Sequence, residues 1–271
     1  MNYIQVQIND INAKQQELLI ALLANAGFDS FEETDTTLKA FITETEFDQT
    51  VLDEVINPFN LSYTSSGIEQ QNWNAQWESS FEPIVVNNFV VIRADFHQPI
   101  KDVKHEIIIT PKMSFGTGHH ATTYMMIEQM EGVDFTGKTV VDFGTGTAVL
   151  AILAEKMGAA KIDAIDYDEW SIENSIENVA ANNCSKIKLI KDETIAAGIV
   201  YNIILANINL NVIIGNLDAI KVVSKKGTII LLSGFIKSDE TNMVNALVEN
   251  GIHPLKTIQK GEWISILGMM N

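Results

Sequence analysis

The chain of 271 residues has little cysteine, little arginine and no long apolar run. Its one cysteine, Cys184, excludes a disulfide framework and a zinc site built from cysteines, and it is typical of a reducing compartment. No apolar run reaches the roughly 18 residues that a membrane-spanning helix needs. The N-terminus also lacks the basic and apolar segments of a secretory signal. We therefore expect a cytoplasmic protein without a membrane-spanning part.

Positive charge is also scarce. Arg93 is the single arginine of the sequence, and 35 acidic residues against 18 basic ones give a formal net charge of −17. Nucleic-acid-binding proteins usually carry a basic stripe and use arginine to recognise phosphate and guanine. We therefore expect no direct binding of nucleic acid. An acidic surface attracts basic partners, although it also serves solubility alone.

Residues 1–68 predict a small α+β domain, because apolar residues first alternate and then recur at helical spacing. The expected elements are a strand at 3–8, a helix at 15–26, strands at 28–33 and 38–43, a helix at 47–56 and a strand at 61–65. This order is that of a ferredoxin-like domain. The segment holds 11 acidic residues and only two basic ones, Lys14 and Lys39.

A polar stretch over 67–76 follows this domain. We assign residues 69–80 as a linker to a second domain over 81–271. The polar stretch at 67–76, which contains Gly67, is a candidate hinge between the two domains. Trp73, Trp77 and Phe81 are spaced four apart, which is typical of an aromatic stripe that docks a connecting helix.

From about residue 139 onward, strand and helix patterns alternate, which predicts a mostly parallel sheet covered by helices. The expected strands lie at 139–142, 161–165, 186–190, 201–206 and 227–232. The expected helices begin near Thr147, Ser171, Asn211 and Ser238. Residues 254–259 and 263–267 predict a terminal hairpin. Together these elements predict a Rossmann-like α/β domain with a seven-stranded sheet.

The first strand of this sheet runs into the sequence Asp142-Phe143-Gly144-Thr145-Gly146-Thr147. Gly144 and Gly146 allow a sharp bend and the close approach of a ligand. A dinucleotide enzyme would typically carry G-x-G-x-x-G here, and Asp142 would repel a pyrophosphate. The acid instead suits the cationic methionine end of S-adenosylmethionine, either directly or through water.

Asp166 ends the second strand, about 20 residues after the glycine turn. A carboxylate at this point can accept hydrogen bonds from both ribose hydroxyls of a nucleoside. The alternative role is a helix N-cap, for which Asp168 and Glu169 are better placed. Asp192 follows the third strand and is a candidate for contact with adenine, with Glu193 as its competitor.

Two further segments resemble the bacterial ribosomal protein L11 methyltransferase (PrmA) family. Residues 111–123, P-K-M-S-F-G-T-G-H-H-A-T-T, resemble the block that the family carries before its cofactor fold. Residues 205–210, L-A-N-I-N-L, are similar to its A-N-I-L segment. The spacing of Trp73, Trp77, Phe81 and Pro83 also resembles the linker entry of the family. With the glycine turn and the Asp166 strand, the matches extend from about residue 73 to 210. The resemblance implies a class I S-adenosylmethionine-dependent methyltransferase whose small N-terminal domain recognises the substrate.

The resemblance also implies a set of site residues. The cofactor contacts carried over are Thr123, Gly144, Asp166 and Asn207, to which the turn and the preceding block add Asp142, Gly146, Phe115 and Gly116. Asn207 is also the candidate catalytic residue, which would accept a hydrogen bond from the target amine. Ala148 stands where the family often has glycine, a change that we expect to be tolerated in packing. Asn209 replaces a frequent leucine and would make the acceptor side more polar.

His119 and His120 do not have the spacing of metal ligands, so we expect no metal. They are expected to order the preceding glycine loop or to cap a helix that begins near Thr122.

The implied function is transfer of methyl groups from S-adenosylmethionine to lysine ε-amines and the N-terminal α-amine of the basic ribosomal protein L11. Residues 207–210 lack the prolines and the ring of segments that grip planar amines, which favours aliphatic amines over nucleobases. A small-molecule N-methyltransferase is one alternative, although it would not need the N-terminal domain. A non-enzymatic acidic assembly factor is another, and it would not bind S-adenosylmethionine. A dehydrogenase is the weakest option, because the glycine pattern differs.

Overall fold

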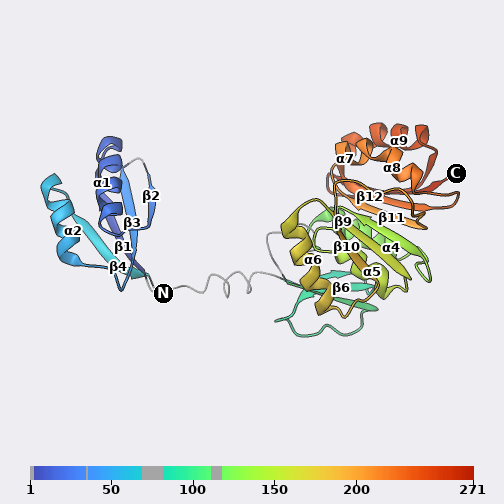
Figure 1. The fold of residues 1–271 in the computed structure, drawn as a ribbon, viewed down its shortest axis with the longest axis horizontal. Coiled ribbons are helices and arrows are strands. Elements are labelled where there is room, and N and C mark those ends of the chain that lie inside the picture. Colours follow the sequence, from blue (N-terminus) through green and yellow to red (C-terminus); the bar gives the residue numbers. More distant parts are fainter. Residues whose placement is uncertain (1–2, 35, 69–81, 111–117) are drawn as a thin grey trace. The chain divides into compact units, whose positions relative to one another are not determined.

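The computed structural model describes residues 3–34, 36–68, 82–110 and 118–271. The chain divides into two compact units, an N-terminal unit over residues 1–80 and a C-terminal unit over 81–271. Figure 1 shows the helices and strands of each unit. Each unit has its own apolar core. The described parts contain no helix that is both long and apolar enough to cross a membrane. The predicted linker at 69–80 and its three aromatic residues lie outside the described residues.

The N-terminal unit has the predicted ferredoxin-like topology. Its elements are β1 (Tyr3–Asn9), α1 (Ala13–Asn25), β2 (Ser30–Glu33), β3 (Thr37–Thr43), α2 (Gln49–Ile56), the short η1 (Asn57–Phe59) and β4 (Tyr63–Ile68). The strand order is β2-β3-β1-β4, and β1 is antiparallel to both β3 and β4. Gly67 lies within β4 opposite Ile4, so it belongs to the sheet, and residues 69–76 of the predicted hinge segment lie outside the described residues.

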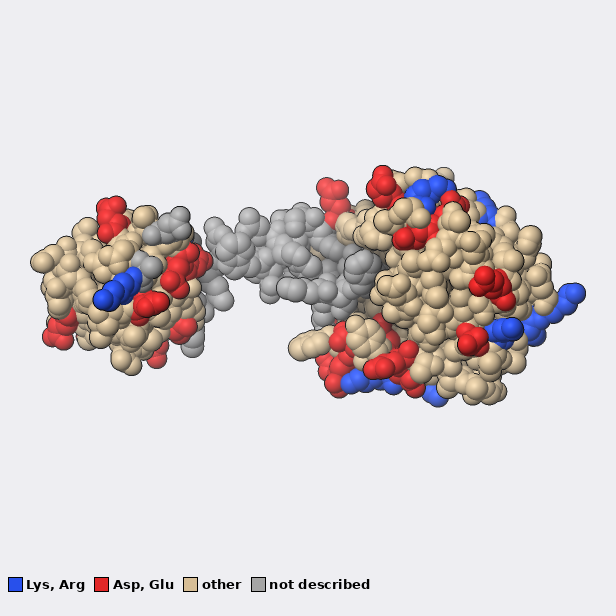
Figure 2. Space-filling view, turned by 90° about the horizontal axis from the view of Figure 1, so that it is seen from above, with Lys and Arg blue, Asp and Glu red and all other residues tan. Residues whose placement is uncertain are grey.

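Local signals explain the helices of this unit. Asn12 caps α1 and forms a capping box with Gln15, and Asp48 caps α2. Acidic side chains predominate on the N-terminal unit in the view of Figure 2, whereas both signs of charge are interspersed over the C-terminal unit.

The C-terminal unit contains the predicted seven-stranded sheet with a terminal hairpin. Its strands are β8 (Thr139–Phe143), β9 (Lys161–Asp166), β10 (Ile187–Lys191), β11 (Ile203–Asn207), β12 (Ile229–Ile236), β13 (Ile252–Lys260) and β14 (Trp263–Met270). Its helices are α4 (Ala121–Met130), α5 (Val149–Lys156), α6 (Glu169–Ala181), α7 (Leu210–Gly215), α8 (Leu217–Val222), the short η2 (Lys237–Asp239) and α9 (Glu240–Glu249). The helix expected from Asn211 is interrupted at Asn216, which ends α7 and begins α8.

The order of this sheet is β10-β9-β8-β11-β12-β14-β13. β8 to β12 are parallel, and β14 is antiparallel to its neighbours. Consecutive residues of β8, Val140 and Val141, belong to different cores, because the sheet is covered on both faces. The chain reverses its direction of winding at β8, and in such sheets ligands bind beyond the carboxyl ends of the strands at that point.

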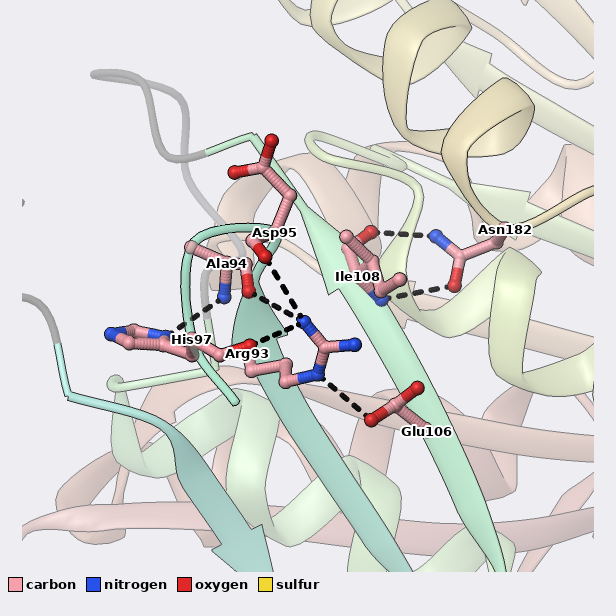
Figure 3. Close-up of polar contacts among 7 residues, drawn as sticks. All are labelled: Arg93, Ala94, Asp95, His97, Glu106, Ile108 and Asn182. Atoms are coloured by element: carbon pink, nitrogen blue, oxygen red, sulfur yellow. Dashed lines mark hydrogen bonds and ion pairs between the residues drawn. The ribbon is translucent and has the colours of Figure 1, made fainter. Parts of the chain in front are cut away.

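A second small sheet was not anticipated from the sequence. It consists of β5 (Ile84–Val86), β6 (Val90–Ala94) and β7 (His105–Ile109), in that order. Asn182, the C-cap residue of α6, completes its edge, because its side chain accepts from the Ile108 N–H at 2.9 Å and donates to the Ile108 carbonyl at 2.6 Å (Figure 3). The strands are too short for their periodicity to stand out.

The side chain of Arg93 stabilises this small sheet. It is 6% exposed, and its Nε donates to Glu106 of β7 at 2.8 Å. Its Nη1 donates to the carbonyl oxygens of Ala94 and His97, each at 2.9 Å (Figure 3). The single arginine therefore holds a loop of the fold.

Candidate functional site

The glycine turn after β8 is fixed to the end of β9. The N–H groups of Gly144 and Thr145 donate to the Ile165 carbonyl oxygen at 2.8 and 2.9 Å. The Gly146 N–H donates to Oδ2 of Asp166 at 2.9 Å. Both glycines have positive φ, 74° and 56°, a conformation that other residues rarely adopt. Asp166 therefore faces the turn.

Two glycines make room for the segment that follows β11. A Cβ at Gly144 would lie 2.1 Å from Cγ2 of Ile208, and a Cβ at Gly234 would lie 2.2 Å from the Ile208 carbonyl oxygen. Gly234 sits in β12 at a register shift between Ser233 and Phe235, with φ at 99°. Ile208 therefore packs between the backbones of Gly144 and Gly234. This packing fixes the position of the neighbouring residue Asn207.

Asp166 is 7% exposed and lines a cavity of about 940 Å³. Its Oδ1 accepts from the Asp168 N–H at 3.1 Å. Asp168 caps α6 by accepting from the Ser171 N–H at 3.0 Å, which confirms the predicted N-cap. The two acids therefore have different roles, and Asp166 faces the cavity.

Asp142 lies behind the turn and is buried. Its Oδ2 accepts from the Thr145 hydroxyl at 2.7 Å, and it is not among the residues that line the cavity. Burial raises the pKa of Asp142 to about 7, and the nearby Asp166 carboxylate adds to this shift, whereas hydrogen bonds from Thr145 and the Ala151 backbone oppose it. A direct contact with a cofactor in the cavity is therefore not supported, and the carboxylate acts on the turn.

Asn207 and Thr123 are hydrogen-bonded to each other, and both line the cavity. Asn207 ends β11 opposite Ser233 of β12, and its Nδ2 donates to the Thr123 hydroxyl of α4 at 3.2 Å. Its Oδ1 is buried and has no hydrogen-bond partner among the described residues. A buried carbonyl oxygen without a partner costs free energy, so it is a candidate acceptor for a ligand.

The cavity brings together most of the residues that the sequence predicted. Its lining includes Thr123, Gly144, Gly146, Asp166 and Asn207, together with the weaker candidates Asp192 and Glu193. Phe115 and Gly116 lie outside the described residues. Asn209 also lines the cavity, but its side chain caps α7 by accepting from the Val212 N–H at 3.1 Å.

The acceptor side also contains residues that the sequence analysis did not assign to the site. Trp263, the first residue of β14, lines the cavity with His120, and their ring centroids lie 4.6 Å apart. His120 caps α4 by accepting from the Thr122 N–H, which confirms one of the two roles expected for the histidine pair. Within the described ranges no group of histidine, cysteine or acidic residues could hold a metal ion.

Helix α6 also supports the turn. Its Ser175 hydroxyl donates to the Gly146 carbonyl oxygen at 2.6 Å. Asn178 donates to the Thr147 carbonyl oxygen at 2.9 Å and accepts from the Thr110 N–H at 2.8 Å. Polar residues at helical spacing on the buried side of α6 were the available signal for this support, and the sequence analysis did not use it.

Ala148 begins α5 in a left-handed conformation, with φ at 63°. This conformation costs an alanine roughly 1 to 2 kcal/mol. Our expectation attributed the glycine often found here to packing of the helix, but the structure gives backbone conformation as the reason.

The chain matches the family described as ribosomal protein L11 methyltransferase (PrmA) over residues 3–271. Relatives with this name occur in Chlorobaculum parvum, at 38% identity over 98% of this chain and 96% of the relative, and in Phocaeicola vulgatus, at 34% identity over 100% of both. A solved ribosomal protein L11 methylase from Lactobacillus delbrueckii subsp. bulgaricus is 25% identical, with a TM-score of 0.66 over 70% of this chain and 100% of that chain. A methyltransferase from Pyrococcus furiosus, 17% identical, shares the fold with a TM-score of 0.52 over 60% of this chain and 88% of its own.

Proposed function

Since the chain belongs to the ribosomal protein L11 methyltransferase family, we propose that it methylates lysine ε-amines and the N-terminal α-amine of ribosomal protein L11. One observation carries this proposal. Asp166 and the glycine turn form one wall of the cavity, and the unpartnered Asn207 Oδ1 lies at another. The site therefore offers a nucleoside-binding end and an amine-binding end.

The residues present fit S-adenosylmethionine, which supplies a methyl group bound to a positively charged sulfur. Asp166 would accept hydrogen bonds from the two ribose hydroxyls, and Gly144 and Gly146 would let the ligand lie against bare backbone. Thr123 and Asn207 would border the methyl group. Phe115 and Gly116 stay predicted contacts. Asp142 would act through the turn, where its negative charge, when present, favours a cation in the cavity.

The acceptor amine must reach the site as a free base. A lysine ε-amine has an ordinary pKa of about 10.4, and desolvation next to a positive sulfur lowers it. Asn207 Oδ1 would accept from one N–H of the amine and so aim the nitrogen lone pair at the methyl carbon. The new N–C bond forms as the C–S bond breaks, and the extra proton on nitrogen leaves to water.

Thr123 is a positioning residue in this arrangement. Its hydroxyl accepts from Asn207 Nδ2, which leaves Oδ1 as the free end of the carboxamide. Preorganised polar groups of this kind stabilise charge that changes during the reaction without having to reorient. The aliphatic amine, rather than a planar one, remains the favoured acceptor because residues 207–210 contain no proline and no ring.

We also assign recognition of the protein substrate to the N-terminal unit. Its first 68 residues hold 11 acidic residues and two lysines, so it attracts a basic partner and speeds the encounter at low salt.

The test is transfer of labelled methyl groups to purified ribosomal protein L11, followed by mass mapping of the modified residues. We expect label on lysine side chains and on the N-terminal amine. Asn207→Ala should bind S-adenosylmethionine within about fivefold of the unmodified protein but transfer methyl groups about 100-fold more slowly. Absence of label on this substrate, with cofactor binding intact, would contradict the assignment.

A further inference from the structure

One face of helix α7 lines the cavity. Asn209, Val212 and Asn216 are the cavity-lining residues of this segment, and their spacing of three and then four residues places them on one side of the helix. Asn209 is the N-cap residue of α7, and Asn216 is its C-cap residue. Asn209 also follows Asn207 by two residues, so their Cα atoms are at most about 7 Å apart. An amine bound to Asn207 therefore has Asn209 in its surroundings.

The carboxamide of Asn209 has one end fixed and one end available. Its Oδ1 accepts from the Val212 N–H at 3.1 Å, which caps α7. Its Nδ2 donates to no residue in the part of the chain that the structure describes, and the side chain is exposed. A carboxamide nitrogen carries two N–H donors. Asn209 therefore offers a hydrogen-bond donor of fixed orientation to a ligand in the cavity.

The two kinds of proposed acceptor amine would place different groups at this donor. In an N-terminal residue, a single carbon separates the α-amine from the carbonyl of the first peptide group. In lysine, four methylene groups separate the ε-amine from the backbone. With its nitrogen at Asn207 Oδ1, an α-amine acceptor can bring its first carbonyl oxygen to Asn209 Nδ2. A lysine would place methylene groups there and leave the donor without water or a partner, which costs free energy.

We propose that Asn209 favours the N-terminal α-amine over lysine ε-amines by donating from Nδ2 to the carbonyl oxygen of the first peptide group of the substrate. This inference rests on the proposed function and adds a specificity-determining residue to the same site. The leucine that the family often has at this position would instead offer an apolar surface to the methylene groups of lysine. The difference between Asn209 and leucine is thus one between two classes of acceptor.

The test measures initial rates of methylation at the N-terminal amine and at lysine side chains of ribosomal protein L11 in a single reaction, by mass mapping. Asn209→Asp keeps an N-cap acceptor for α7 and replaces the two N–H donors by an acceptor oxygen. We expect the ratio of the α-amine rate to the lysine rate to fall about tenfold. Asn209→Leu removes the donor without adding charge, and the ratio should fall by a similar factor.

The matched control is Asn211→Asp. Asn211 is an exposed residue of α7 that does not line the cavity, so the same substitution adds the same charge to the same helix without altering the site. The ratio should change by less than twofold. The ordinary pKa values, about 8 for an α-amine and about 10.4 for lysine, favour the α-amine in every variant alike, so they cancel from the comparison.

Three outcomes would overturn the inference. An unchanged ratio in both Asn209 variants would mean that Asn209 only caps α7. An equal fall in Asn211→Asp would mean that charge on the helix, and not the donor, sets the ratio. Methylation of lysines alone by the unmodified protein would remove the preference while leaving lysine methylation intact.

Folding and the proposed function are checked separately. Thermal unfolding of Asn209→Asp should match that of the unmodified protein, because the cap is kept. If Asn209→Leu is unstable through loss of the cap, Asn209→Asp and its control decide. Lack of methylation at every amine of ribosomal protein L11 would contradict the proposed function itself, and the inference with it.

Discussion

The two units differ in how their polar side chains are placed. Among the described residues of the N-terminal unit, Gln16 is the only buried polar side chain. The C-terminal unit buries many, and those at the cavity or at the glycine turn beside it include Thr123, Asp142, Asp166, Ser175 and Asn178. Buried polar groups destabilise a fold unless each is hydrogen-bonded, so their concentration around one cavity indicates a site that needs fixed atoms.

Recognition of a protein partner through surface charge constrains the sequence less than the buried polar site of the C-terminal unit does. The N-terminal unit combines a simple apolar core with an acidic exterior, and 11 of the 35 acidic residues but only two of the 18 basic ones lie in its first 68 positions. Surface charge acts over several ångströms and tolerates many arrangements. The comparison teaches that methyl transfer and substrate recognition should be separable by mutation, one unit at a time.

The largest effect is expected for Asp166→Ala. Loss of charge-assisted hydrogen bonds to the ribose should weaken binding of S-adenosylmethionine at least about 100-fold, as measured by calorimetry. The matched control is Asp48→Ala in the N-terminal unit, which removes the N-cap of α2 and should cost about 1 kcal/mol of stability. Weaker cofactor binding in Asp48→Ala would show that the two units are not separable.

A pair of glycines provides the second test. Gly144→Ala places a Cβ 2.1 Å from Ile208 and should cost more than about 2 kcal/mol of stability and most of the cofactor affinity. Gly27→Ala in the N-terminal unit has the same sign of φ, but its Cβ would lie at an ordinary 3.5 Å from Ile42. It should cost about 1 kcal/mol and leave cofactor binding unchanged. Similar losses in both variants would mean that backbone conformation alone explains Gly144.

The sequence was informative where function depends on the ends of parallel strands. Gly144, Asp166 and Asn207 follow three strands that lie side by side in the sheet, and carboxyl ends of parallel strands share one edge. Their convergence on one cavity could therefore be predicted. Trp263 could not be placed in the same way, because it reaches the cavity from an antiparallel strand at the far end of the chain.

Other parts of the site had signals that are clear only in structural context. Gly234 interrupts a strand pattern, and such a glycine often marks a bulge or a close approach of backbone. For Asp142, the sequence was informative about the position in the fold but not about the contacts of the side chain. Its position at the strand end was evident, but whether its carboxylate faces the cavity or the turn depends on side-chain packing, and the structure places it with Thr145.

The third prediction concerns the pH dependence of the free energy of unfolding. It follows from the raised pKa of the buried Asp142 carboxyl group. Its pKa of about 7 in the folded protein exceeds the ordinary value of about 4, so between these values the folded state holds a proton that the unfolded state has lost. The stabilising contribution is present below about pH 4 and is lost as the pH rises through about 7. Relative to Asp142→Asn, the unmodified protein should lose about 2 kcal/mol between pH 5 and 7 and only a few tenths more by about pH 8. Denaturant unfolding at several pH values measures this difference, and a constant difference would contradict the raised pKa.

The smallest effect tests whether buried polar groups of the C-terminal unit serve the fold or the site. Asn178 of α6 and Asn182, the C-cap residue of this helix, lie four residues apart. Both hold the small sheet, through Thr110 and Ile108 respectively. Asn178 alone also donates to the Thr147 carbonyl oxygen of the turn.

Replacing either asparagine by alanine leaves backbone groups without partners and should cost similar stability, roughly 1 to 3 kcal/mol. Asn178→Ala should in addition weaken cofactor binding about tenfold, whereas Asn182→Ala should change it less than twofold. Equal affinities in the two variants would show that α6 supports the fold and leaves the shape of the turn to β9, since the Ile165 and Asp166 contacts would then suffice to hold it.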